Sequence, residues 1–139
     1  MPNHVHLIMH YAGGRLSLNT SLGTGKRFIA YEIVNRLKAL GKVEILEILH
    51  EAVQPKDRSR GKKHEVWMDA FDIKECRTEK FLLQKLNYIH NNPCTKYWNL
   101  ATEPHLYRHS SALQYMNGKI SMYRVKDYLE FIGMYFHSE

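Results

Sequence analysis

The sequence predicts an α+β fold in which helices cover one face of an antiparallel sheet. Segments 4–11 and 64–71 have the length and apolar content of β-strands, and Gly13 and Gly14 end the first of them. Apolar residues at helical spacing occupy most of the remaining chain. With 139 residues, 44% of them hydrophobic, the chain is long enough to fold as a single domain with its own core.

The first half of the chain contains two predicted helices, over 26–40 and 43–53. Asn19 or Thr20 could cap the first of them, although Gly23 and Gly25 delay its start. Gly41 is a natural stop between the two helices. Segment 54–63 is polar, and we interpret it as a loop.

The second half contains a predicted helix over 78–91, which Thr78 opens and after which Pro93 prevents continuation. Ser110 or Ser111 could cap a short helix that Gly118 closes. A last helix is predicted over 123–135.

The formal net charge of +6 favours a polyanionic partner, most often a nucleic acid. The densest basic cluster lies in the predicted loop, where it would contact phosphates if the protein acts on nucleic acid. We call it the basic segment, and it contains Lys56, Arg58, Arg60, Lys62 and Lys63.

No apolar run approaches the ~20 residues that cross a bilayer, and no signal-peptide pattern opens the chain. Cys76 and Cys94 lack the spacing of metal ligands. We therefore expect a cytoplasmic protein with reduced thiols and no membrane partner.

His4 and His6 are two residues apart, so on a strand both imidazoles would project from the same face and could grip one metal ion. Tyr88 and Asn92 are four apart on a predicted helix and project side by side. Two imidazoles and a carboxamide oxygen make a three-ligand site with open positions. Mg²⁺ or Mn²⁺ held there could polarise a phosphodiester oxygen.

A tyrosine phenol has a pKa of about 10, so at neutral pH it needs a nearby metal or positive charge to become a nucleophile. Lys85 is a candidate for that charge. Attack by Tyr88 on a backbone phosphate would give a covalent phosphotyrosine and a free hydroxyl. The energy of the broken bond would be kept for rejoining.

Four blocks in this order resemble the HUH single-tyrosine transposases, and most closely their REP-associated branch. The first block is Met-Pro-Asn-His-Val-His-Leu-Ile, and the others span residues 66–72, 86–93 and 107–115. The resemblance implies that His4, His6 and Asn92 hold a divalent metal, Mg²⁺ or Mn²⁺. It also implies that Tyr88 forms a 5′-phosphotyrosine link with single-stranded DNA.

The same resemblance implies a ferredoxin-like or RRM-like sheet, single-stranded DNA with a hairpin as partner, and a nucleoid-associated bacterial protein. In relatives, a strand, a helix and a second strand precede the histidine motif. We therefore expect residues 1–139 to be one incomplete domain with a C-terminal helical segment and weak or absent activity. A homodimer that shares strands or a site stays open.

Two other interpretations stay open. A basic chain with 12% aromatic residues would suit a non-catalytic nucleic-acid-binding module or a remnant of a transposase. A structural zinc site could instead use His4, His6 and a further histidine, such as His10 or His64.

Overall fold

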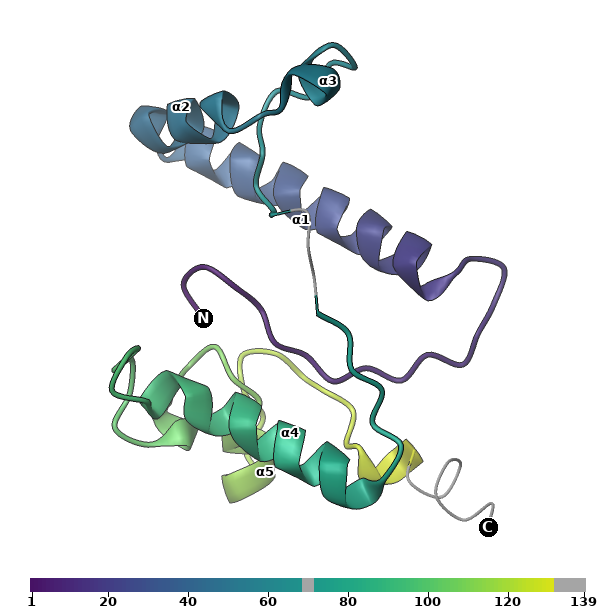
Figure 1. Cartoon of the computed structure of the whole chain (residues 1–139). Coiled ribbons are helices and arrows are strands. Elements are labelled where there is room, and N and C mark those ends of the chain that lie inside the picture. Colours follow the sequence, from purple (N-terminus) through teal and green to yellow (C-terminus); the bar gives the residue numbers. More distant parts are fainter. Residues whose placement is uncertain (69–71, 132–139) are drawn as a thin grey trace. The chain divides into compact units, whose positions relative to one another are not determined.

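The computed structural model describes residues 1–68 and 72–131. The chain forms two units, and each has its own set of helices (Figure 1). The first unit combines Met1–His10 with Lys74–Glu139, and the second is Tyr11–Ile73.

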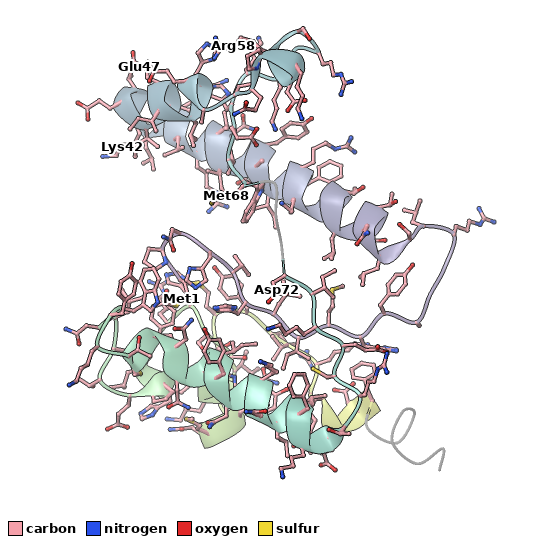
Figure 2. The ribbon with its side chains drawn as sticks, viewed as in Figure 1. Met1, Lys42, Glu47, Arg58, Met68 and Asp72 are labelled. Atoms are coloured by element: carbon pink, nitrogen blue, oxygen red, sulfur yellow. The ribbon has the colours of Figure 1, made fainter. Side chains whose placement is uncertain are left out.

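The second unit is a pair of helices followed by a returning segment. Helix α1 spans Leu18–Ala39 and helix α2 spans Val43–Glu51, and the two helices are in contact. Gly41 lies in the turn between them with φ of +63°, a conformation that side chains with a Cβ rarely adopt. Lys42 and Glu47 are exposed near this turn (Figure 2).

Helix α1 begins earlier than predicted because Ser17, rather than Asn19 or Thr20, is its N-cap. The Ser17 hydroxyl accepts a hydrogen bond from the Thr20 amide at 3.1 Å. The helix then passes through Gly23, although glycine weakens a helix interior. A favourable cap and a long run of helical residues outweigh that cost.

Part of the predicted loop over 54–63 is also helical. Helix α3 spans Pro55–Arg58, with Pro55 in its first turn. Proline suits that position because its φ is already helical and its missing amide hydrogen would have no partner there. The proline therefore starts a helix here rather than extending a loop.

In the first unit, helix α4 spans Glu79–Asn91 and continues into the 3-10 helix η1, Asn92–Cys94. Thr78 caps α4 as predicted, since its hydroxyl accepts from the Phe81 amide at 3.2 Å. The 3-10 helix η2 spans Pro104–Leu106 and helix α5 spans Ala112–Asn117. Gly118 ends α5 with φ of +64°, which confirms the predicted stop.

The best-packed part of the first unit is where the end of α4 meets α5. His90, Asn92, Pro93 and Ala112 are all buried there. His90 Nε2 lies 2.9 Å from the Ser111 hydroxyl, which joins the last turn of α4 to the residue before α5. This packing fixes the end of the helix that carries Tyr88.

The predicted antiparallel sheet, and with it the ferredoxin-like or RRM-like fold, is wrong. The described residues contain helices and irregular segments but no strand. Segment 4–11 has the composition of a strand. A strand needs a partner, and within 1–68 and 72–131 no second extended segment pairs with its backbone. Its side chains contact α4 and the loop after η1 instead.

The second predicted strand, 64–71, is irregular over 64–68, and residues 69–71 lie outside the described part. The Glu65 amide donates to the Leu49 carbonyl at 2.7 Å. The Trp67 indole donates to the Lys26 carbonyl at 2.8 Å. This segment therefore docks on helices through single hydrogen bonds rather than through a ladder.

The predicted helix over 123–135 is described only in part. The prediction is wrong over 123–128, which are not helical. Residues 129–131 are helical, and 132–135 lie outside the described residues. Among the described helices, none has the length and apolar character needed to cross a bilayer.

Candidate functional site

The imidazoles of His4 and His6 lie against each other at the start of the first unit. Their ring centroids are 4.7 Å apart and their planes meet at 78°. A metal–imidazole bond is about 2.0–2.1 Å long, so two rings at this separation are near enough to share one ion when a nitrogen of each faces it. The two rings are therefore in contact, although the backbone between the residues is not a strand, and their sharing of a metal ion stays a prediction.

Tyr88 reaches this pair from helix α4. The Tyr88 and His6 rings have centroids 5.5 Å apart with an edge-to-face angle of 76°. The Tyr88 side chain remains 55% exposed, so the phenol is open to a ligand from solvent. The structure thus brings together three of the predicted site residues from distant parts of the sequence.

Asn3 fixes which nitrogen of His4 is available. The Asn3 Oδ1 atom lies 2.7 Å from His4 Nδ1. An amide oxygen only accepts hydrogen bonds, so Nδ1 carries the proton and Nε2 keeps its lone pair. Nε2 is then the nitrogen that could bind a metal ion, in the way that a hydrogen bond to the other ring nitrogen orients metal-ligating histidines.

The pKa values of both imidazoles are lowered, which favours the neutral form that a metal ligand requires. Partial burial lowers the pKa of His4, and the charge at the amino terminus adds to the effect. Partial burial also lowers the pKa of His6, and the neighbouring His4 lowers it further. Protonation of either ring would remove its lone pair and weaken metal binding at acidic pH.

Asn92 lies one helical turn beyond Tyr88 and is only 6% exposed. Among the described residues, the Asn92 carboxamide makes no hydrogen bond. In the same part of the chain, every side-chain nitrogen or oxygen that is closed off from solvent has a hydrogen-bond partner. The carboxamide therefore keeps some access to solvent. The hydrogen bonds and ring contacts of the described residues do not join Asn92 to His4 or His6, so its role as the third ligand stays a prediction.

This donor set suits a divalent ion of intermediate hardness. Imidazole nitrogens favour transition metals, whereas a carboxamide oxygen favours Mg²⁺, Ca²⁺ or Mn²⁺. Mn²⁺ accepts both kinds of ligand, so two histidines and one asparagine fit it better than Mg²⁺.

The alternative zinc set is not assembled in the described part of the chain, where no three His, Cys, Asp or Glu side chains are placed to share an ion. The His10 ring lies against Phe131, with centroids 4.8 Å apart. His64 belongs to the second unit, where its ring faces His50 at 6.2 Å. Cys76 and Cys94 are free thiols.

Lys85, the candidate charge near Tyr88, makes a contact within helix α4. Its ammonium lies 5.0 Å from the centroid of the Phe81 ring, one turn back along α4, which is a cation–π contact. Lys85 thus packs over Phe81, and the ring beside Tyr88 is that of His6.

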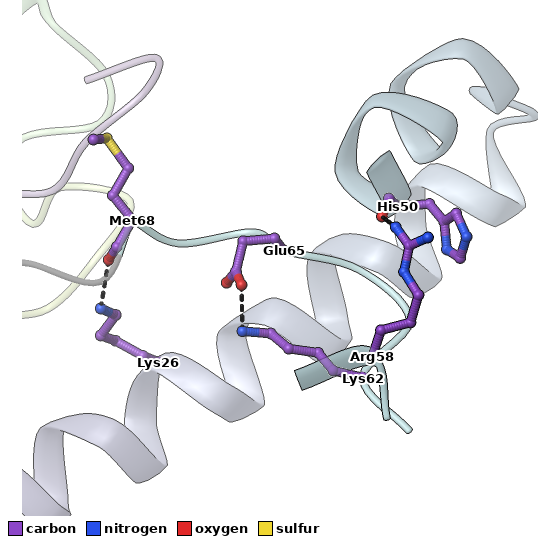
Figure 3. A network of polar contacts seen from close by, with 6 residues as sticks. All are labelled: Lys26, His50, Arg58, Lys62, Glu65 and Met68. Atoms are coloured by element: carbon purple, nitrogen blue, oxygen red, sulfur yellow. Dashed lines mark hydrogen bonds and ion pairs between the residues drawn. The ribbon is translucent and has the colours of Figure 1, made fainter. Parts of the chain in front are cut away.

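The basic segment belongs to the second unit, and Figure 3 shows the partners of two of its side chains, Arg58 and Lys62. Arg58 donates to the His50 carbonyl at 3.0 Å, and Lys62 pairs with Glu65. These two side chains stabilise the end of the helical pair. The side chains that stay exposed, with no contact found among the described residues, are Lys56, Arg60 and Lys63.

Two neighbours of the histidine pair were missed by sequence reasoning. Asn3 directly precedes His4, and an amide beside a candidate ligand was a signal that could have been used. The Trp98 ring lies 5.1 Å from the His4 ring and belongs to the loop after η1. Nothing in the sequence indicates that second contact, because it depends on how the loop folds back.

Comparison with known proteins adds no relative: no protein-family model, curated protein or solved structure matches this chain.

Proposed function

We propose that the protein nicks and rejoins single-stranded DNA with Tyr88 as nucleophile and a divalent metal at His4, His6 and Asn92. The observation that carries the proposal is the contact between the His6 and Tyr88 rings. Sequence proximity explains why His4 lies near His6, but only the fold explains why Tyr88 joins them. An exposed phenol beside a pair of neutral imidazoles is the arrangement that such chemistry needs.

The reaction balances without an external energy source. The Tyr88 hydroxyl oxygen attacks the phosphorus of a phosphodiester and forms an Oη–P bond, while the bond from phosphorus to the 3′ oxygen breaks. The phenol proton is lost to solvent, and the departing oxygen takes up a proton to become a 3′ hydroxyl. The reverse steps rejoin the strand.

The protein's own groups have separate roles in this reaction. His4 and His6 present neutral nitrogens, and Asn3 sets the tautomer of His4. A divalent ion held there would supply positive charge near the phosphate oxygens and so stabilise the charge that develops during attack. The packed end of α4 limits the movement of Tyr88 relative to the histidines.

The test is a covalent-adduct assay. The protein is incubated with a labelled single-stranded DNA that contains a hairpin, in the presence of Mn²⁺, and adducts are resolved on a denaturing gel. We expect an adduct with the natural protein and none with Tyr88→Phe, because phenylalanine has no attacking oxygen. Chelation of the metal should also abolish the adduct.

Tyr123 offers a matched control. It is 56% exposed, close to the exposure of Tyr88, and its ring lies 6.3 Å from that of His109. Tyr123→Phe should leave the adduct unchanged. An adduct that persists in Tyr88→Phe would contradict the proposal.

A non-catalytic nucleic-acid-binding protein is the second candidate, and the exposed cations of the basic segment favour it. Salt-dependent binding of the DNA with no adduct under any metal would support this candidate over the first.

A further inference from the structure

Five aromatic rings form a continuous row through the candidate site, and we call it the aromatic row. Its rings belong, in order, to Tyr97, Trp98, His4, His6 and Tyr88. Successive ring centroids are 4.8, 5.1, 4.7 and 5.5 Å apart. The row therefore runs from the proposed nucleophile at one end to a second tyrosine at the other.

The exposure of the Tyr97 side chain is not explained by core packing. Its side chain is 83% exposed, more than any other large aromatic side chain recorded as exposed in the described part. Its ring meets Trp98 at 88°, so the two are edge to face rather than stacked. An exposed ring in this arrangement keeps a face on which another flat ring can stack.

The loop that carries Tyr97 is held in one conformation. The amides of Trp98 and Asn99 both donate to the Thr95 carbonyl, at 3.1 and 2.8 Å, and the Leu100 amide donates to the buried Pro93 at 2.9 Å. Asn99 has φ of +45°, an uncommon conformation for a residue other than glycine. Tyr97 is thus displayed by a pinned loop, which lowers the entropy cost of binding.

We propose that Tyr97 is a stacking subsite for one unpaired base of a single-stranded nucleic acid, with Trp98 supporting its ring. The inference rests on the proposed function, because a phosphate of the same nucleic-acid strand would lie at Tyr88. Tyr88 is at the other end of the aromatic row. Single strands are bound by aromatic side chains on which bases stack together with cations that neutralise phosphates. Cations that could neutralise the phosphates are also present. Lys96 is exposed next to Tyr97, and the chain has a net charge of +6.

The test measures binding without chemistry. All proteins carry Tyr88→Phe and the buffer contains EDTA, so that no adduct forms. The probe is a fluorescein-labelled DNA with a hairpin and an unpaired thymidine flank, and affinity is read from fluorescence anisotropy. Tyr97→Ala should weaken binding by about tenfold, because one stacked base is lost.

Two further variants make the readout specific. Tyr97→Phe keeps the ring and should bind within about twofold of the parent. Tyr123→Ala removes a different exposed ring and should have no effect. The dependence of affinity on salt should be the same for the parent and Tyr97→Ala, because stacking releases no counterions.

Abasic substitution locates the base. Replacing each unpaired thymidine in turn with an abasic residue should cost about tenfold at one position in the parent and little in Tyr97→Ala. The inference is overturned if Tyr97→Ala binds like the parent, if Tyr123→Ala loses as much, or if the parent does not bind. Because the assay needs no adduct, its failure is distinguishable from failure of the proposed nicking.

Discussion

At the residue scale, the site depends on which ring nitrogens of the histidines are free. The Asn3 carboxamide accepts from His4 Nδ1 and so leaves Nε2 unprotonated. The identity of His4, His6 and Tyr88 could be predicted from the sequence, because their residue types and spacing suit the chemistry. The role of Asn3 could not, since it depends on the direction of one side chain.

Asn3→Ala should weaken Mn²⁺ binding by about tenfold, because His4 then populates both tautomers and loses its orientation. The measurement is a titration in which free Mn²⁺ is followed by electron paramagnetic resonance. Asn3→Asp keeps an acceptor oxygen and should restore most of the affinity. Equal affinity in the alanine variant and the natural protein would show that Asn3 does not position His4.

His90 provides a pH-dependent contribution to stability. It is 4% exposed, and burial lowers its pKa below the value of about 6.5 that it has in the unfolded chain. The unfolded state therefore binds the proton more readily. The stabilisation is complete above about pH 6.5 and falls as the pH drops toward the folded-state pKa.

The free energy of unfolding in urea should consequently decrease from about pH 7 to about pH 5, with at most about 1.4 kcal/mol per pH unit from this group. His90→Gln can still hydrogen-bond Ser111 and should show a shallower decrease. The exposed His109 serves as control, and His109→Gln should follow the natural protein. Identical pH profiles for His90→Gln and the natural protein would contradict this account.

At the element scale, the longer helices were predictable and the strands were not. A helix satisfies its own backbone, so local signals such as the Thr78 cap and the Gly118 stop were sufficient. A strand depends on a partner elsewhere in the chain, and no alternation of residues over 4–11 can show whether that partner exists. Ser17 was missed because the nearby glycines of α1 pointed to a later start.

Thr78→Ala should destabilise the protein by about 1 kcal/mol, because the Phe81 amide loses its side-chain acceptor at the start of α4. The midpoint of urea unfolding measures the effect. Thr78→Ser retains the hydroxyl and should be close to the natural protein. Thr102→Ala changes an exposed threonine in a loop and should be neutral. A loss of similar size at Thr102 would show that the cap is not the cause.

At the scale of the whole molecule, one chain is sufficient to bring the two histidines and Tyr88 into contact. Met1–His10 and the segment from Lys74 onward belong to one unit, although residues 11–73 separate them in the sequence. The contact between His6 and Tyr88 lies within this unit. The sequence left open whether the site is shared between two molecules, because spacing along a chain does not show which copies meet.

Mixing two inactive variants tests this assembly. Tyr88→Phe lacks the nucleophile, and His6→Ala lacks a metal ligand. If each chain builds its own site, a mixture of the two variants should form no more adduct than either variant alone. Recovery of adduct on mixing would indicate a site shared between molecules.

The central claim is that Tyr88 is the nucleophile. The most direct test is to find which residue of the protein carries the DNA. Trypsin cleaves after Lys85 and Lys96, and Tyr88 is the only tyrosine in the peptide between them. Mass spectrometry of the digested adduct should find that peptide with the mass of a 5′-linked nucleotide and Tyr88 as the modified residue. DNA attached to a different peptide, or no covalent DNA on any peptide, would contradict the account.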